Sequence, residues 1–347
     1  MSTTCQECSL HEETSGGQLL ITSGCIKPQM PIKVDVEIKV SFNNTEYIFP
    51  GTGSAHIDDD LSDGYGGAVY VYDETHIKIF VPNRNNGRDT GYVVFIDEKW
   101  DGIAPMNISE ALVRARVWRH SDAPRADFFH NWTNISNGSY SELIHRLPSV
   151  PSYVVVQVAF EDGNSTFISE GQGSAQLNIR RGSLHSGGVL FGFDDTEIRI
   201  WAGATYIMLA TDGWGDSSSS LLQTSGKIRV FAWILPTDAY FKHVNLSDDI
   251  ISFQPAIDIN TALISVEVIP RNGNNSGFHF PAIGSAVVEP HNPISGVIYA
   301  YSNTSVALWK PDHTGYMLYF GSEWGGGVMS EMSRDADIIV KAVRLVD

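Results

Sequence analysis

Hydrophobic and polar residues alternate with a period of two along most of the chain. The runs "VDVEIKVSF" (34–42), "HIKIFV" (76–81) and "LVRARVW" (112–118) place apolar side chains at every second position, and β-branched residues are frequent in them. This period is typical of β-strands with one face in a core, whereas an amphipathic helix would repeat every three to four residues. The pattern therefore predicts an all-β protein built from antiparallel strands.

The same order of motifs recurs three times. The segments 51–82, 171–202 and 282–311 begin with "GTGSA", "GQGSA" and "AIGSA". Each continues through a short Asp/Asn/Ser turn to an aromatic run that ends at a Trp, and then to a closing alternating run. A fixed order of motifs indicates copies of one folding unit. With six expected strands in each copy, the sequence predicts three tandem antiparallel β-sandwiches.

These copies suggest the domain organisation. We expect an N-terminal cysteine-bearing tail (1–33), sandwiches at 34–118, 153–233 and 262–347, and connectors at 119–152 and 234–261. Each connector carries an aromatic pair ahead of an Asn-x-Ser/Thr pattern, Phe128–Phe129 in the first and Tyr240–Phe241 in the second. Flexible spacers are instead rich in Gly, Ser or Pro. The connectors should therefore dock on a neighbouring unit, or lend a strand to the next unit or the next chain.

The charge and the apolar runs of the chain limit the classes of partner that it is expected to bind. The formal net charge is −17, and Lys and Arg are sparse and scattered. A surface that follows a phosphate backbone needs clustered cations, so nucleic acid is not expected as a partner. No apolar run approaches the ~20 residues of a membrane span. The start "MSTTCQECSL" lacks the apolar core of a secretory signal, which leaves an intracellular chain or a piece of a longer precursor.

Glycosylation patterns favour the second alternative. The Asn-x-Ser/Thr sequon occurs nine times, where chance would give about three, at Asn43, Asn107, Asn131, Asn134, Asn137, Asn164, Asn245, Asn274 and Asn303. Three of these, Asn43, Asn164 and Asn274, fall in the turn between the first and second expected strands of successive units. An excess of sequons in turns predicts a secreted or cell-surface glycoprotein.

Cysteines and acidic residues offer little metal chemistry. Cys5, Cys8 and Cys25 all precede the first unit, and an odd number leaves one thiol free or paired with another chain. The CxxC pair lacks a second pair to complete a zinc site. Asp58, Asp60 and Ser62 have the alternate spacing of a calcium loop, but the matching stretch of the second unit, "NIRRGSL", is basic. We expect disulfides among the cysteines, no cofactor, and at most a calcium site private to the first unit.

Catalytic patterns are not evident. His76, His185, His279 and His313 do not share one aligned position, and the chain contains no GxSxG or HExxH motif. A nucleophile with its base should be present intact in at least one unit. The sequence therefore predicts that the protein is not an enzyme.

An acidic, Gly-rich loop with a Trp ends the fifth expected strand of each unit, at Trp100, Trp214 and Trp324. One interpretation is a lectin-like platform, in which the ring stacks on a sugar and nearby carboxylates accept its hydroxyl hydrogen bonds. The other is that the Trp covers the open end of the core. The residue before the Trp changes from Lys99 to Gly213 to Glu323, which favours the structural interpretation.

In general architecture the chain resembles the tandem β-sandwich repeat modules of invertebrate extracellular matrix and adhesion glycoproteins, and it resembles H-type lectins in strand count alone. The first resemblance implies a secreted structural or adhesive glycoprotein. Repeated units with heterologous contacts would self-assemble into homo-oligomers, or into head-to-tail filaments. The alternative function is a multivalent lectin that gains avidity for glycans from three linked Trp loops.

Overall fold

The computed structural model describes the larger part of the chain. The described residues are 17–22, 30–56, 64–83, 90–121, 123–175, 186–210, 213–215, 220–235, 240–244, 247–254, 256–286 and 294–344. Within these ranges the regular structure consists of β-strands and one short 3-10 turn, η1 (Gly325–Gly327). The all-β, antiparallel character that the alternating pattern predicts is confirmed.

Six main strands follow in the same order in each of the three predicted units. The first unit contains β2 (Lys33–Phe42), β3 (Thr45–Pro50), β5 (Val69–Tyr72), β6 (His76–Val81), β8 (Val94–Ile96) and β11 (Leu112–Trp118). The second contains β14 (Tyr153–Asp162), β15 (Ser165–Glu170), β16 (Val189–Phe193), β17 (Glu197–Ala202), β18 (Met208–Ala210) and β20 (Ser225–Trp233). The third contains β23 (Ala262–Pro270), β24 (Phe280–Pro281), β25 (Ile298–Tyr301), β26 (Ser305–Pro311), β27 (Leu318–Phe320) and β29 (Ala336–Arg344).

Short strands fill the loops of these units. They are β4 (Gly64–Gly66), β7 (Thr90–Tyr92), β9 (Trp100–Asp101), β10 (Met106–Ile108), β19 (Leu221–Gln223) and β28 (Glu331–Ser333). The hairpin between β2 and β3 turns through Asn43 and Asn44, whose φ angles are 49° and 62°. A two-residue hairpin turn with positive φ at both positions favours Asn, which explains the residue types at this tip.

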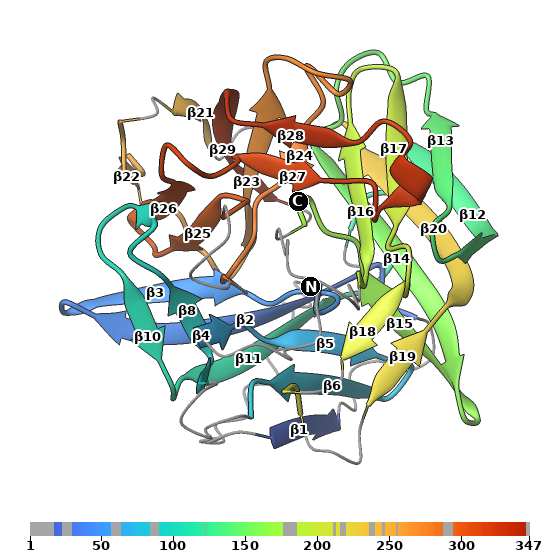
Figure 1. Ribbon diagram of the computed structural model, residues 1–347, viewed down its shortest axis with the longest axis horizontal. Helices are drawn as coiled ribbons and strands as arrows, with labels where there is room; N and C mark the ends of the chain where they lie inside the picture. Colours follow the sequence, from blue (N-terminus) through green and yellow to red (C-terminus); the bar gives the residue numbers. More distant parts are fainter. Residues whose placement is uncertain are drawn as a thin grey trace.

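The units do not form separate sandwiches, because both seven-stranded sheets contain strands of two units. Strand β5 of the first unit pairs with β15 of the second, and β25 of the third unit pairs with β3 of the first. Strand β16 of the second unit meets β24 of the third through the bridge between Phe193 and His279. The third strand of every unit thus joins the second strand of the next, and the cycle closes. Figure 1 shows the first unit (blue), the second (green to yellow) and the third (orange to red) arranged round the centre.

The connectors belong to these sheets. The first supplies β12 (Phe128–Ser136), which pairs with β20, and β13 (Tyr140–Ile144), which pairs with β17. The second supplies β21 (Tyr240–Val244), paired with β29, and β22 (Ile250–Ser252), paired with β26. Strand β1 (Gly17–Thr22) pairs with β6 in the place that β13 and β22 take in the later units. Each connector therefore lends two strands to the unit that follows it, which was one of the expected alternatives.

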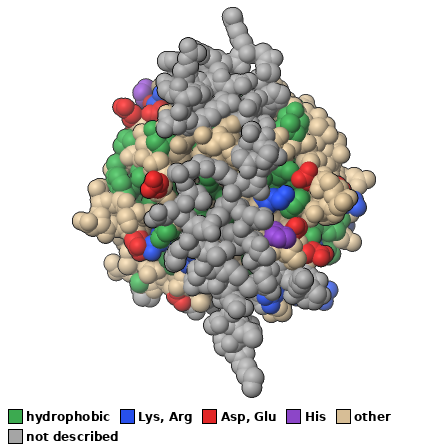
Figure 2. Space-filling model, turned by 90° about the horizontal axis from the view of Figure 1, so that it is seen from below, with side chains coloured by type: hydrophobic (Ala, Val, Ile, Leu, Met, Phe, Trp, Pro, Cys, Tyr) green, Lys and Arg blue, Asp and Glu red, His purple; other side chains and the backbone are tan. Residues whose placement is uncertain are grey.

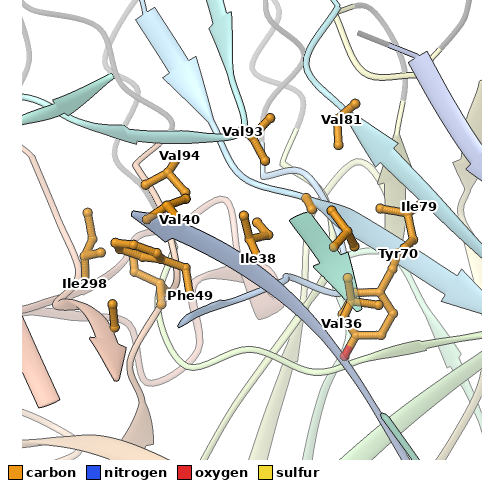
Figure 3. Packing of buried hydrophobic residues seen from close by; sticks show 14 of the residues in the cluster. Val36, Ile38, Val40, Phe49, Tyr70, Ile79, Val81, Val93, Val94 and Ile298 are labelled. Atoms are coloured by element: carbon orange, nitrogen blue, oxygen red, sulfur yellow. The ribbon is translucent and has the colours of Figure 1, made fainter. Parts of the chain in front are cut away.

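The hydrophobic core is also shared between units. Val36, Ile38 and Val40 alternate along β2 and face Phe49 of β3, while Ile298 of the third unit packs beside them in Figure 3. These side chains are buried almost completely. Removal of this apolar surface from water stabilises the association of two units as well as the unit itself.

Charged side chains are dispersed over the described part of one face of the molecule. On the face shown in Figure 2, the acidic and basic side chains outside the grey region lie singly or in small mixed groups. On the described part of this face, Lys and Arg side chains are not gathered into one patch.

Candidate functional site

The repeated Gly-Ser-Ala motif forms the contacts between units. A Cβ atom added at the glycine would lie 1.9 Å or less from a backbone carbonyl oxygen of the following unit in the cycle. The three pairs are Gly53 with Glu170, Gly173 with Pro281, and Gly284 with Pro50. Only glycine allows this approach, so the motif marks a structural junction.

The serine and alanine of the motif continue this junction. The backbone N–H of Leu209 in β18 donates to Ser54 Oγ at 2.9 Å, and the N–H of Ala55 donates to the Leu209 carbonyl at 2.8 Å. The same two bonds join Ser174 and Ala175 to Tyr319, and Ser285 and Ala286 to Phe95. The fifth strand of each unit is thereby fixed to the preceding unit.

The three loop tryptophans lie in these junctions too. Trp100, Trp214 and Trp324 are each only 2% exposed. They form backbone bridges to the end of the fourth strand of another unit, at Pro311, Pro82 and Gly203 respectively. At this exposure the tryptophans present little ring surface on which a sugar could stack. The structural interpretation agrees with this burial.

Glycines next to these tryptophans are explained by packing. A Cβ atom on Gly102 would lie 2.4 Å from the Trp309 ring, and one on Gly215 would lie 2.8 Å from Phe80. One on Gly325 would lie 2.6 Å from Trp201. The Gly-rich loops therefore let the chain cross closely over an aromatic ring of the neighbouring unit.

Other sequence-predicted residues lie outside the described ranges. They are Cys5, Cys8, Cys25, Asp58, Asp60, Ser62, His185 and Asn245. The disulfide and calcium predictions therefore stay predictions. In the part of the chain that is described, no group of three or more His, Cys, Asp or Glu side chains is placed to hold a metal ion.

Buried charges connect the first unit with the other two. Glu37, which is 2% exposed, accepts hydrogen bonds from Arg116 Nη2 and the Tyr301 hydroxyl of the third unit, both at 2.5 Å. Lys33 of the first unit forms an ion pair with Glu170 of the second, and its ammonium also lies 2.7 Å from Asp35. Burial opposes the charge of Lys33, but Asp35 and Glu170 outweigh it and raise the pKa of Lys33 well above its ordinary value. Burial also raises the pKa of Glu170.

A similar cluster joins the second and third units. Glu267 accepts hydrogen bonds from Lys341 at 2.6 Å and from His279 at 2.7 Å, and the His279 ring stacks on Phe193 of the second unit. Burial disfavours the charge of Glu267, but Lys341 and His279 hold its pKa below the ordinary value. The clusters line a small central cavity of about 140 Å³. Lys33 pairs with Glu170 across one unit boundary, and Tyr301 donates to Glu37 across another, so this cavity is part of the junction.

His56 lies where all three units meet. Its Nε2–H donates to Gln172 Oε1 of the second unit, because the Gln172 amide nitrogen itself donates to the Ser54 carbonyl at 2.9 Å. The His56 ring also meets Trp324 of the third unit edge-on, with the ring centres 5.8 Å apart. Burial lowers the pKa of His56 to about 4, so the ring is neutral at pH 7.

The best candidate for a ligand surface is a large open groove, here called the outer groove. It has a volume of about 1360 Å³ and lies over β12, β20, β14 and β15, with the turn between β5 and β6 at one side. Its lining includes hydroxyl, amide and charged side chains together with Trp132, Tyr140 and Phe160. Such a mixture of polar groups and aromatic rings is suited to sugars.

Two polar networks border the outer groove. The Thr166 hydroxyl lies 2.9 and 3.0 Å from the carboxylate oxygens of Glu161. Asp73 accepts hydrogen bonds from the backbone N–H groups of Thr75 and His76 at 2.6 and 2.7 Å. Partial burial disfavours the charge of Asp73, but these hydrogen bonds keep its pKa below the ordinary value. Asp73 is therefore an ionised acceptor for hydroxyl groups at neutral pH.

Trp132 is the residue of this groove that sequence analysis missed. It lies at an irregularity in β12, where the register with β20 shifts between His130 and Thr133. Its ring covers the Arg229 guanidinium at 4.6 Å, and the side chain remains partly exposed. The available signal in the sequence is a Trp among polar residues, in "HNWTN".

Sequon asparagines are accessible throughout the described chain. Every sequon Asn in these ranges is exposed, namely Asn43, Asn107, Asn131, Asn134, Asn137, Asn164, Asn274 and Asn303. By contrast Asn275, which is not the Asn of a sequon, is buried and bonds to Glu331 and Met329. Two of the exposed asparagines, Asn134 and Asn164, line the outer groove.

Comparison with known proteins adds no relative. No protein-family model matches the chain, and no curated protein is significantly similar to it in sequence. In the described ranges, no helix has the length and apolar character needed to cross a bilayer.

Proposed function

We propose that the protein is a secreted or cell-surface structural glycoprotein with an adhesive role. The observation that carries this proposal is the exposure of all eight described sequon asparagines, which is the condition for attachment of a bulky glycan. Three of them, Asn131, Asn134 and Asn137, lie on or beside β12, the end strand of its seven-stranded sheet. Glycans there would protect an open sheet edge from pairing with other chains.

The decisive experiment is the intact mass of natural material before and after enzymatic removal of N-glycans. A loss of mass equal to several glycans, with glycopeptides at the exposed sequons, is expected. An unchanged mass would remove the basis of this proposal. Site occupancy at Asn303 and Asn107, far apart in the sequence, would show whether modification covers the molecule or one region.

Self-assembly of the adhesive glycoprotein would use the outer surface of the closed cycle of three units. The contacts that would have extended a head-to-tail filament join the third unit back to the first. Heterologous contacts that close in this way give a ring and no open polymer. Exposed apolar side chains on peripheral strands offer another surface, and these are Phe129, Ile144, Ile250 and Met332. Burial of such side chains between molecules would favour association.

Sedimentation velocity tests the assembly proposal. Association should increase with salt, because the net charge of −17 repels identical molecules at low ionic strength. The variant N131Q/N134Q/N137Q should associate more strongly than N43Q/N274Q/N303Q, which loses the same number of sequons away from β12. Equal sedimentation of the two variants at all salt concentrations would remove β12 from the proposed assembly surface.

A second candidate is a carbohydrate-binding protein that uses the outer groove in place of the three loop tryptophans. Trp132 supports it, since a partly exposed ring beside hydrogen-bonding side chains is a common way to hold a sugar. Glycan-array binding by the deglycosylated protein, lost in Trp132→Ala, would favour this function. Binding that survives in Trp132→Ala would exclude the groove as its site.

A further inference from the structure

The outer groove holds two sequons that come from different parts of the chain. Asn134 is on β12, and Asn164 is in the turn between β14 and β15. Strand β20 lies between β12 and β14 in the sheet, so these two strands are roughly 10 Å apart, at about 4.8 Å for each strand spacing. Asn134 is level with Ala159 through Lys227, and the turn with Asn164 begins after Asp162, which adds roughly 10 Å along the strands. Both side chains are exposed and border the same open space.

The groove between them has the chemistry of a sugar site. Hydroxyl groups of Ser136, Ser225 and Thr166, the Glu161 carboxylate and the Lys227 ammonium supply donors and acceptors for sugar hydroxyls. Trp132 supplies a partly exposed ring, held in place by Arg229 at 4.6 Å. The volume of about 1360 Å³ exceeds the ~300–1,000 Å³ of a site that encloses a drug-sized ligand. It is therefore large enough for an oligosaccharide of several rings.

We infer that the N-glycans attached at Asn134 and Asn164 lie along the outer groove, with their core sugars packed against Trp132. This inference rests on the proposed function, because it requires that the chain is glycosylated. In the modification itself, the Asn amide nitrogen bonds to the anomeric carbon of an oligosaccharide diphosphate carrier and loses one proton. The diphosphate leaves with the electron pair of the broken C–O bond. The groove residues take no part in that step and act on the attached sugars.

Covalent attachment of the glycans to Asn134 and Asn164 would let an open groove retain their sugars. A free monosaccharide must offset the translational and rotational entropy that it loses on binding. A glycan tethered at the rim has already lost most of this freedom, so weak contacts with Trp132, Glu161 and Lys227 suffice. The groove would then be covered by the chain's own modification.

The chain contains matched controls for a test. Asn43, Asn164 and Asn274 occupy the equivalent turn in the three units, and Asn43 and Asn274 are not among the residues of the outer groove. The rate at which a peptide N-glycosidase releases each glycan from the native protein can be followed by glycopeptide mass spectrometry. Release from Asn134 and Asn164 should be at least about tenfold slower than release from Asn43 and Asn274, given an added stabilisation of ~1.4 kcal/mol. On denatured protein the rates should be equal.

Variants at Trp132 complete the test. Trp132→Ala keeps the sequon at Asn131 and should raise the rates at Asn134 and Asn164 toward those of the controls, while Trp132→Phe should retain slow release. Thermal unfolding of each variant shows that the fold is intact. Equal native release rates at all four sites in the unaltered protein overturn the inference while the glycoprotein proposal stands. Occupied controls with unmodified Asn134 and Asn164 also overturn it. Absence of glycan at every site overturns the proposed function instead.

Discussion

The junctions between units and the outer groove are built on opposite rules. At the junctions, Gly, Ser and Trp recur at matched positions of all three units and are buried against backbone atoms of a neighbour. In the outer groove the important ring, Trp132, lies in a connector at an irregularity of β12 and is partly exposed. The residues that are repeated in all three units are therefore the ones that hold the closed cycle of units together. Trp132, the ring of the candidate ligand groove, lies in a connector outside the repeated motifs.

The first prediction concerns a variant in which the closed cycle of three units is interrupted. Removal of residues 262–347 takes β25 away from β3 and β24 away from β16. The remaining two units should lose cooperative folding, because two sheets lose strands and a shared core is opened. Far-UV circular dichroism and dispersion of amide NMR signals measure this. A folded two-unit fragment with a sharp unfolding transition would instead support independent sandwiches.

The second prediction compares two tryptophans. Trp214→Ala should lower the free energy of unfolding by about 4 kcal/mol, because a large buried side chain is replaced by a cavity between units. Trp132→Ala should lower it by about 1 kcal/mol, the size of a partly exposed cation–π contact. Urea unfolding gives both values. Similar losses for the two variants would contradict the contrast between junction and groove.

The third prediction concerns a glycine of the junction. Gly173→Ala should cost about 3 kcal/mol, because its Cβ atom would overlap the Pro281 carbonyl oxygen and force two units apart. Gly163→Ala is the matched control in the same unit, where nothing lies within 4 Å of the added atom. Its positive φ of 62° should cost about 1 kcal/mol. A control that is as unstable as Gly173→Ala would refute the steric explanation.

The fourth prediction uses pH to probe the meeting point of the units. His56 has a pKa of about 4 when folded and an ordinary value of 6.5, so the unfolded chain binds the proton more tightly. Its contribution is complete above pH 6.5 and is lost as the pH falls toward 4, which amounts to about 2–3 kcal/mol. His56→Gln keeps a neutral N–H donor and should remove this part of the pH dependence. Parallel stability curves for both proteins between pH 7 and 4 would disprove this role of His56.

Much of the fold was predictable because strand periodicity and repeated motifs are local properties. The period-two runs placed the six main strands, and the Asn-rich turn at Asn43 placed a hairpin tip. The pairing partners were not predictable in the same way. Strand β5 bonds to β15, far along the chain, and nothing in the alternation of β5 distinguishes an edge within one unit from an edge shared by two. Pairing is decided by which edges meet when the cores pack.

For the candidate site too, some features were predictable from the sequence and others depended on the tertiary structure. The sequence alone determined which asparagines are sequons and that Trp100, Trp214 and Trp324 occupy equivalent loops. Tertiary structure decided that these Trp side chains are buried in junctions. Only the closed cycle of three units brings Pro82, Gly203 and Pro311 against them. The tertiary structure also decided that Asn134 and Asn164 border one groove, since β12 and β14 pair with opposite edges of β20. Residue type and spacing are written in the chain, whereas burial and proximity arise from contacts between distant segments.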